Sequence, residues 1–170
     1  RLKSLGLTDN TYILNHSLPK KIDLSQFNSI YKFKRSFRSL FNQPLRIASS
    51  GFCLPNKGYE QLIRAVDLLL KKQIPVNLKI YSPIYKNYDS YFNEIKKLID
   101  DLNLSKYVSI DNEFLDQNIL VSSLTKYDLL VYPYQNSFES SSASVRDGIS
   151  SGTPVAVTPS SIFSDISEIS

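Results

Sequence analysis

The sequence predicts an α/β fold built on a doubly wound parallel sheet. From Pro44 onward, short β-rich apolar runs alternate with amphipathic helical patterns, as in right-handed βαβ units. Runs that are apolar throughout, such as Leu129-Leu130-Val131-Tyr132, are typical of strands covered on both faces. A length of 170 residues suits one such domain.

The elements follow from these patterns in chain order. A strand is expected at Leu45–Ser49, where the apolar run ends in Ser-Ser-Gly, and Pro83 closes the next strand, Val76–Tyr81. The spacing of apolar residues predicts helices over Lys57–Lys72 and Tyr88–Leu102. The same reasoning predicts five further elements, which are the strand Val108–Ile110, the helix Asn118–Lys126, the strand Asp128–Tyr134, the helix Ser140–Ser151 and the strand Thr153–Thr158. A last helix is expected to begin near Ile162.

The charge is concentrated in residues 1–44. This segment has eight Lys and Arg against two Asp, so its net charge is +6. The other 126 residues have a net charge of −2, which gives the total of +4. Within it, Gln26–Phe41 is predicted to be a basic amphipathic helix with its phenylalanines on one side. The basic residues do not run along the whole fold, which disfavours a nucleic-acid-binding protein.

Composition excludes several other classes. One Cys and one His, Cys53 and His16, cannot build a disulfide framework or a His/Cys metal cluster. We expect Cys53 to be a small apolar side chain and His16 to be structural. No apolar run approaches the roughly 18 residues of a membrane span. The chain begins at Arg1 and ends within a pattern, so we interpret it as a piece of a larger protein.

The first candidate binding loop joins the first strand to the first helix, from Ser49 to Gly58. Such a junction directs backbone N–H groups and the positive end of a helix at an anion, and Lys57 adds a charge. The alternative is an ordinary turn with a solvated lysine. The loop lacks the Gly-x-Gly-x-x-Gly and Walker patterns, which disfavours dinucleotide-binding and P-loop sites.

The second candidate loop runs from Pro133 to Gly148, after the most apolar strand. Its cluster of serines suits helix caps and anion binding better than a helix interior. Glu139 and Asp147 are eight positions apart, a turn of about 80° on a helix, so both can face one cleft and bind hydroxyls on either side of a diphosphate. The alternative is a capped helix with surface acids. Arg146 either reaches a phosphate or forms a surface ion pair.

Together these segments resemble the C-terminal half of a GT-B glycosyltransferase, and glycosyltransferase family 4 in particular. The specific match is Glu139 and Asp147 followed by Gly152-Thr-Pro-Val, and Gly51 and Gly58 around Lys57 are also similar. The resemblance implies a Rossmann-like donor-binding domain over residues 45–170. It implies that residues 1–44 connect this domain to an N-terminal acceptor domain, which the sequence lacks.

The resemblance also implies an activity. The expected enzyme is a retaining hexosyltransferase that needs no metal or other cofactor and moves a hexose from a nucleotide-diphosphate sugar to a glycan or lipid-linked acceptor. Cell-envelope polysaccharide synthesis is the expected setting. The location implied is the cytoplasm, with peripheral contact at the inner face of the membrane left open. The fragment alone is expected to be inactive.

Individual roles follow from the family pattern. Lys57 and Glu139 would be catalytic, with Lys57 on the diphosphate and Glu139 on the sugar hydroxyls. The first loop would contribute Gly51 to the donor site, and Phe114 and Leu115 would border the nucleobase. Asp147 would bind the ribose, and phosphate or sugar oxygens would be held by Ser140, Ser141 and Ser142. Two positions depart from the pattern: Phe52 stands where many members have Arg, and Asp147 replaces a Glu.

Two functions from other classes stay open at this point. Asp111, at the end of a predicted strand, is the one feature that supports a flavodoxin-like signalling or ligand-binding module. The Gln26–Phe41 pattern would suit an anionic membrane or a nucleic acid, although we favour a helix that packs on the domain. A set of tyrosines, at positions 81, 85, 88 and 91, is expected to form a packing cluster rather than line a site.

Overall fold

The structure is a computed structural model, and it describes residues 43–135, 141–163 and 166. These residues form a five-stranded parallel sheet in the order β3-β2-β1-β4-β5. The strands are β1 (Leu45–Ser50), β2 (Val76–Tyr81), β3 (Val108–Asp111), β4 (Leu129–Tyr132) and β5 (Val155–Val157). The predicted fold class is confirmed. The predicted connector over residues 1–44, including Gln26–Phe41 and His16, lies almost entirely outside the described residues.

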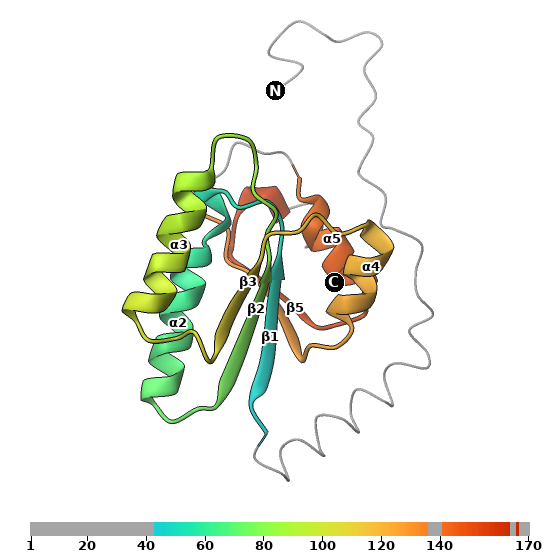
Figure 1. Cartoon of the computed structure of the whole chain (residues 1–170). Helices are drawn as coiled ribbons and strands as arrows, with labels where there is room; N and C mark the ends of the chain where they lie inside the picture. The colour runs from blue at the N-terminus through green and yellow to red at the C-terminus, as the bar shows by residue number, and fades with distance from the viewer. Residues whose placement is uncertain (1–42, 136–140, 164–165, 167–170) are drawn as a thin grey trace, which may run out of the picture.

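Helices cover both faces of the sheet (Figure 1). The helices α2 (Tyr59–Lys71) and α3 (Asp89–Asp101) pack on one face, where their apolar sides join Ile47, Leu78 and Ile80 in one core. The helices α4 (Gln117–Leu124) and α5 (Ala143–Ser150) lie on the other face, around Ala48, Leu130 and Tyr132. Two cores on opposite faces are what a doubly wound sheet requires.

Several predicted boundaries are wrong. The first helix does not begin at position 57, because a short 3-10 helix, η2 (Pro55–Lys57), ends at Gly58, which has a φ of 72°. The last predicted helix is also a 3-10 turn in the described part of the chain, η3 (Ser161–Phe163). The strand predicted over Thr153–Thr158 is reduced to β5, which lies at the sheet edge with Val157 43% exposed.

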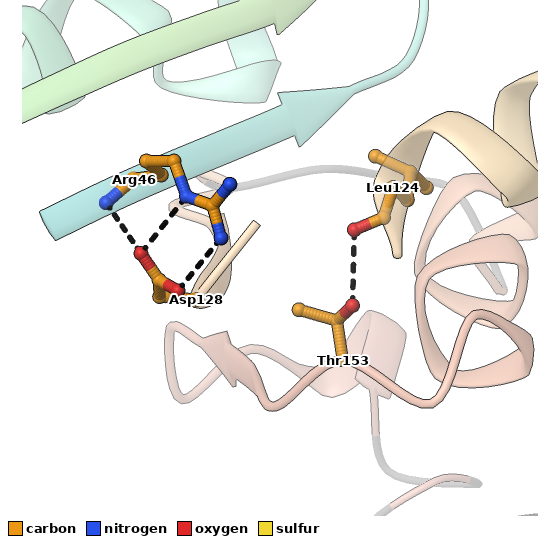
Figure 2. A network of polar contacts seen from close by, with 4 residues as sticks. All are labelled: Arg46, Leu124, Asp128 and Thr153. Carbon is orange, nitrogen blue, oxygen red and sulfur yellow. Dashed lines mark hydrogen bonds and ion pairs between the residues drawn. The ribbon is translucent and has the colours of Figure 1, made fainter. Parts of the chain in front are cut away.

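Polar contacts fasten β4 and α5 to their neighbours (Figure 2). Asp128, just before β4, accepts bonds from the backbone N–H of Arg46 at 2.9 Å and from its guanidinium at 3.1 and 3.3 Å. The hydroxyl of Thr153 donates to the carbonyl of Leu124 at 3.0 Å, which joins the loop between α5 and β5 to the end of α4. These contacts fix the position of the strand that carries the second candidate loop.

The strand order reverses next to β1. The connections through α2 and α3 build the sheet toward β3, whereas α4 returns the chain to β4 on the other side of β1. The loops after β1 and β4 therefore leave the carboxyl ends of two neighbouring strands, at the switch point of the sheet. Ligands of open α/β sheets bind at such a point.

Candidate functional site

The two loops at the switch point are fastened to each other. The backbone N–H of Gln135 donates to the carbonyl of Asn56 at 2.8 Å. A Cβ atom on Gly58 would lie 1.9 Å from the carbonyl oxygen of Pro133, so only glycine permits this approach. The first loop therefore rests directly on the second.

Lys57 lies between these loops and is buried. Its side chain is 6% exposed, and its Nζ atom lies 4.2 Å from the ring centroid of Tyr134. A cation over an aromatic face is stabilised electrostatically, more so when water is excluded. The interpretation of Lys57 as a solvated surface lysine is thus wrong.

Tyr134 also reaches the start of α5. Its hydroxyl lies 3.0 Å from that of Ser142, which caps the helix by accepting a bond from the N–H of Val145 at 3.4 Å. Arg146, 5% exposed, donates to the carbonyl of Ser142 at 3.1 Å. We call Lys57, Tyr134, Ser142 and Arg146 the buried cluster. Arg146 is therefore not at the surface, where the predicted ion pair would place it.

The prediction that a helix begins at Ser140 is wrong. Ser141 and Ser142 are not helical, and α5 begins at Ala143 because Ser142 supplies the cap. A helical angle between positions 139 and 147 therefore does not apply. Glu139 and Ser140 lie outside the described residues, so their predicted roles stay predictions.

A pocket of about 210 Å³ opens beside the cluster, at the carboxyl ends of β1 and β3 and the first turns of α4 and α5. It brings together four of the predicted site residues, which are Gly51, Phe114, Leu115 and Asp147. Lys57 and Ser142 do not line it and belong to the buried cluster instead. Ser141 lies just before α5 and is half-buried.

Asp147 is one of two acids that line this pocket, and Glu113 is the other. Its carboxylate accepts a hydrogen bond from Nε2 of Gln117 at 2.7 Å. Burial raises the pKa of Asp147 above its usual value, and the Gln117 bond opposes that shift. Gln117 also lines the pocket and is a residue that sequence reasoning missed. Nothing in the sequence pattern marks it, because the contact joins positions 30 residues apart.

Phe52 and Glu113 are further lining residues that had no predicted site role. The tyrosine cluster is only partly as predicted. Tyr85 and Tyr88 are exposed, and their ring centroids are 6.3 Å apart. Tyr81 instead lines the pocket, and its hydroxyl forms a hydrogen bond of 2.9 Å with that of Tyr127. Cys53 is buried, and burial raises the pKa of its thiol.

The structure gives less support to the other functions than the sequence did. The carboxylate of Asp111 pairs with Lys79 at 3.5 Å and accepts a bond from the N–H of Glu113 at 3.1 Å. Ser49 and Ser50, which stand where a receiver module needs acids, are fully buried. Among the described residues no group of three or more His, Cys, Asp or Glu could hold a metal ion. No described helix is long and apolar enough to span a membrane.

Comparison with known proteins gives one family. The sequence model of the glycosyl transferases group 1 family matches residues 32–168. No curated protein sequence matches the chain.

Many solved structures share the fold. The C-terminal domain of the glycosyl transferase group 1 protein LpcC from Francisella tularensis has a TM-score of 0.60 at 17% identity, covering 72% of this chain and 62% of that one. Anabaena HepE, solved with UDP and glucose, has a TM-score of 0.60 at 16% identity, with 88% and 39% covered. The trehalose-phosphate synthase from Burkholderia xenovorans has a TM-score of 0.62 at 13% identity, with 87% and 38% covered. The chain thus spans less than two thirds of each.

Proposed function

The chain belongs to the glycosyl transferases group 1 family, and from this premise we propose that residues 45–170 bind the nucleotide-sugar donor of a retaining, metal-independent glycosyltransferase. The observation that carries the proposal is the meeting of two loops at the switch point, with a buried lysine and a helix N-terminus on one side and an acid-containing pocket on the other. The whole enzyme would transfer a hexose to a glycan or lipid-linked acceptor, in the cytoplasm or at the inner face of the membrane. Cell-envelope polysaccharide synthesis and membership of glycosyltransferase family 4 remain part of this proposal.

The donor diphosphate is placed against the buried cluster. Lys57 and the first N–H groups of α5 would face the negative charge that grows on the diphosphate when the bond to the sugar carbon breaks. Because these donors are already fixed by Tyr134 and by the adjoining loop, they need little reorganisation during the reaction. A preformed positive site of this kind is what a transfer without a metal ion requires.

The nucleoside is placed in the pocket. Asp147 would accept hydrogen bonds from the ribose hydroxyls, and Gln117 holds its carboxylate in place at 2.7 Å. Phe114 and Leu115 would border the base, since both line the same pocket. Glu139 is proposed to bind the sugar hydroxyls. The acceptor and the base that assists it are assigned to the N-terminal domain.

Calorimetric titration of the chain with UDP- and GDP-sugars tests the proposal. Lys57→Met keeps the length of the side chain and removes its charge, so we expect about 10-fold weaker binding than in the unmodified chain. Asp147→Ala and Glu139→Ala test the contacts to ribose and sugar. Lys97→Ala, on the exposed side of α3, is the control and should bind normally.

Thermal unfolding of each variant separates lost binding from lost folding. The absence of binding to any of these donors at millimolar concentration by the folded, unmodified chain would overturn the proposed function.

A further inference from the structure

Exposed aromatic rings gather at the mouth of the pocket. Phe52 follows β1, Tyr85 follows β2 and Phe114 follows β3, and these side chains are 38%, 49% and 76% exposed. Large exposed apolar side chains gathered in one place usually mark a binding site. Here three separate loops contribute to the same group.

The rings of Phe52 and Phe114 lie close together in the lining of the pocket. Their ring centroids are 6.4 Å apart and their planes are inclined by 29°. Because stacked carbon atoms approach to about 3.5–4 Å, a flat ring inserted between two others needs about 7–8 Å. The centroids are closer together than that, so the rings must move apart by about 1–2 Å to admit a base. Phe114 is 76% exposed, so little packs against its ring on the outer side.

Tyr85 packs against one of these two rings. Its ring meets Phe52 edge-on, with centroids 5.3 Å apart and an interplanar angle of 69°. Such edge-to-face contacts are favourable between aromatic rings.

We infer that Phe52 and Phe114 form a slot for the nucleobase of the donor and that Phe52 is a further donor-binding residue, which stacks on the base. The inference rests on the proposed function, because Asp147 in the same pocket is the proposed ribose ligand. Phe52 stands where many family members have an Arg that would bind phosphate, and in this chain the same position would contact the base instead. We refer to Phe52 and Phe114 together as the aromatic slot.

A slot of this kind favours aromatic bases without distinguishing strongly among them. Every base has a flat π-face, so stacking tolerates different bases. We expect UDP, GDP and ADP to bind with affinities within about 10-fold of one another. A site that recognised the base through its edge would separate them further.

Proton NMR titration of the 170-residue chain provides the test. In the unmodified chain, stacking should move the base H5 and H6 signals of UDP upfield through the ring currents of the slot. Phe52→Ala should remove most of this shift and weaken the binding of UDP about 10-fold. The affinity for inorganic pyrophosphate should not change. Phe52→Tyr should restore both readings. Tyr107→Ala, which removes an exposed ring at the opposite end of the strands, is the matched control.

Two results would overturn the slot while leaving the proposed function standing. One is normal UDP affinity and an unchanged upfield shift in Phe52→Ala; the other is equal weakening of UDP and pyrophosphate, which would assign Phe52 to the phosphates or to the loop alone. Failure of the unmodified chain to bind any nucleotide would overturn the proposed function together with the slot.

Discussion

The buried cluster and the aromatic slot lie at the same end of the sheet and are built in opposite ways. In the cluster, the charged and hydroxyl groups of Lys57, Tyr134, Ser142 and Arg146 are almost completely enclosed and contact one another. In the slot, Phe52 and Phe114 are exposed, and their ring centroids are 6.4 Å apart. One region is packed and closed, whereas the other is open to solvent and can admit a flat ring once its two rings move apart by about 1–2 Å.

The difference follows from what each region is proposed to recognise. Charge is stabilised best by donors that are fixed and shielded from water, since exposed ion pairs contribute little. A flat apolar ring needs only two faces that can close on it, so exposed side chains with rotational freedom suffice. Changes in the buried cluster should therefore affect folding as well as binding, whereas changes in the slot should affect binding alone.

The largest effect on stability is expected at Gly58, where the first loop rests on the second beside the buried cluster. Gly58→Ala places a Cβ atom 1.9 Å from the Pro133 carbonyl at a residue with a φ of 72°. We expect a loss of about 3 kcal/mol in the free energy of unfolding, because backbone strain adds to the collision. Urea unfolding measures it.

Gln73→Gly is the control for this substitution. Gln73 also has a positive φ, 59°, and lies in the turn after α2, so glycine should relieve strain and leave stability equal or higher. Unfolding of Gly58→Ala at the same urea concentration as the unmodified chain would show that the two loops are not fastened as described.

A smaller effect is expected at Tyr134, where two substitutions separate its ring from its hydroxyl. Tyr134→Leu removes both and should cost about 2 kcal/mol in stability, with weaker pyrophosphate binding because Lys57 loses the ring under its ammonium. Tyr134→Phe keeps the ring and loses the bond to Ser142, so it should cost about 1 kcal/mol and retain most of the binding. Equal pyrophosphate affinity in folded Tyr134→Leu and Tyr134→Phe would contradict a positioning role for the ring.

The smallest effect on stability is expected at Asp147 in the pocket, and it depends on pH. Burial raises the pKa of this carboxyl in the folded chain, so the folded state binds its proton more tightly than the unfolded state does. Stability should therefore fall as pH rises from about 3.9, the ordinary pKa of Asp, through the raised value. Asp147→Asn should remove this dependence and be the more stable protein at neutral pH. Thermal unfolding across that range gives the comparison.

Binding at Asp147 should show the opposite trend. The ionised carboxylate is the better acceptor for ribose hydroxyls, so uridine affinity should decrease as the solution becomes more acidic. Uridine is the suitable probe because it has no phosphate to titrate. Gln117→Ala should move the decrease to higher pH, since the Gln117 bond holds the pKa of Asp147 down. A pH profile that is the same in Gln117→Ala would argue against this arrangement.

The sequence predicts the strands and loops that form the site better than it predicts the contacts of the side chains within it. Apolar periodicity places the strands within a few residues, and the rule for parallel sheets places the loops after β1 and β4 at one edge. The start of α5 was missed because any of several serines could cap it. The choice of Ser142 accompanies its contact with Tyr134, which no local pattern encodes.

The burial and the neighbours of the site residues depend on contacts between segments that are distant in the sequence. A lysine after a turn is expected in solvent, and Lys57 is buried because a tyrosine 77 positions later lies under its ammonium. Phe52 first suggests only a missing charge. Its neighbours Tyr85 and Phe114 come from two other loops, so the slot becomes visible only in the folded chain.

The most direct test of the account is a crystal structure of the chain with UDP. We predict the diphosphate within hydrogen-bonding distance of Lys57 and the first N–H groups of α5, the ribose on Asp147, and the base between Phe52 and Phe114. The strands have a second groove at their amino ends, about 310 Å³ in volume and lined by Arg46, Lys79 and Lys106. UDP bound in that groove, with the switch-point loops empty, would contradict the account.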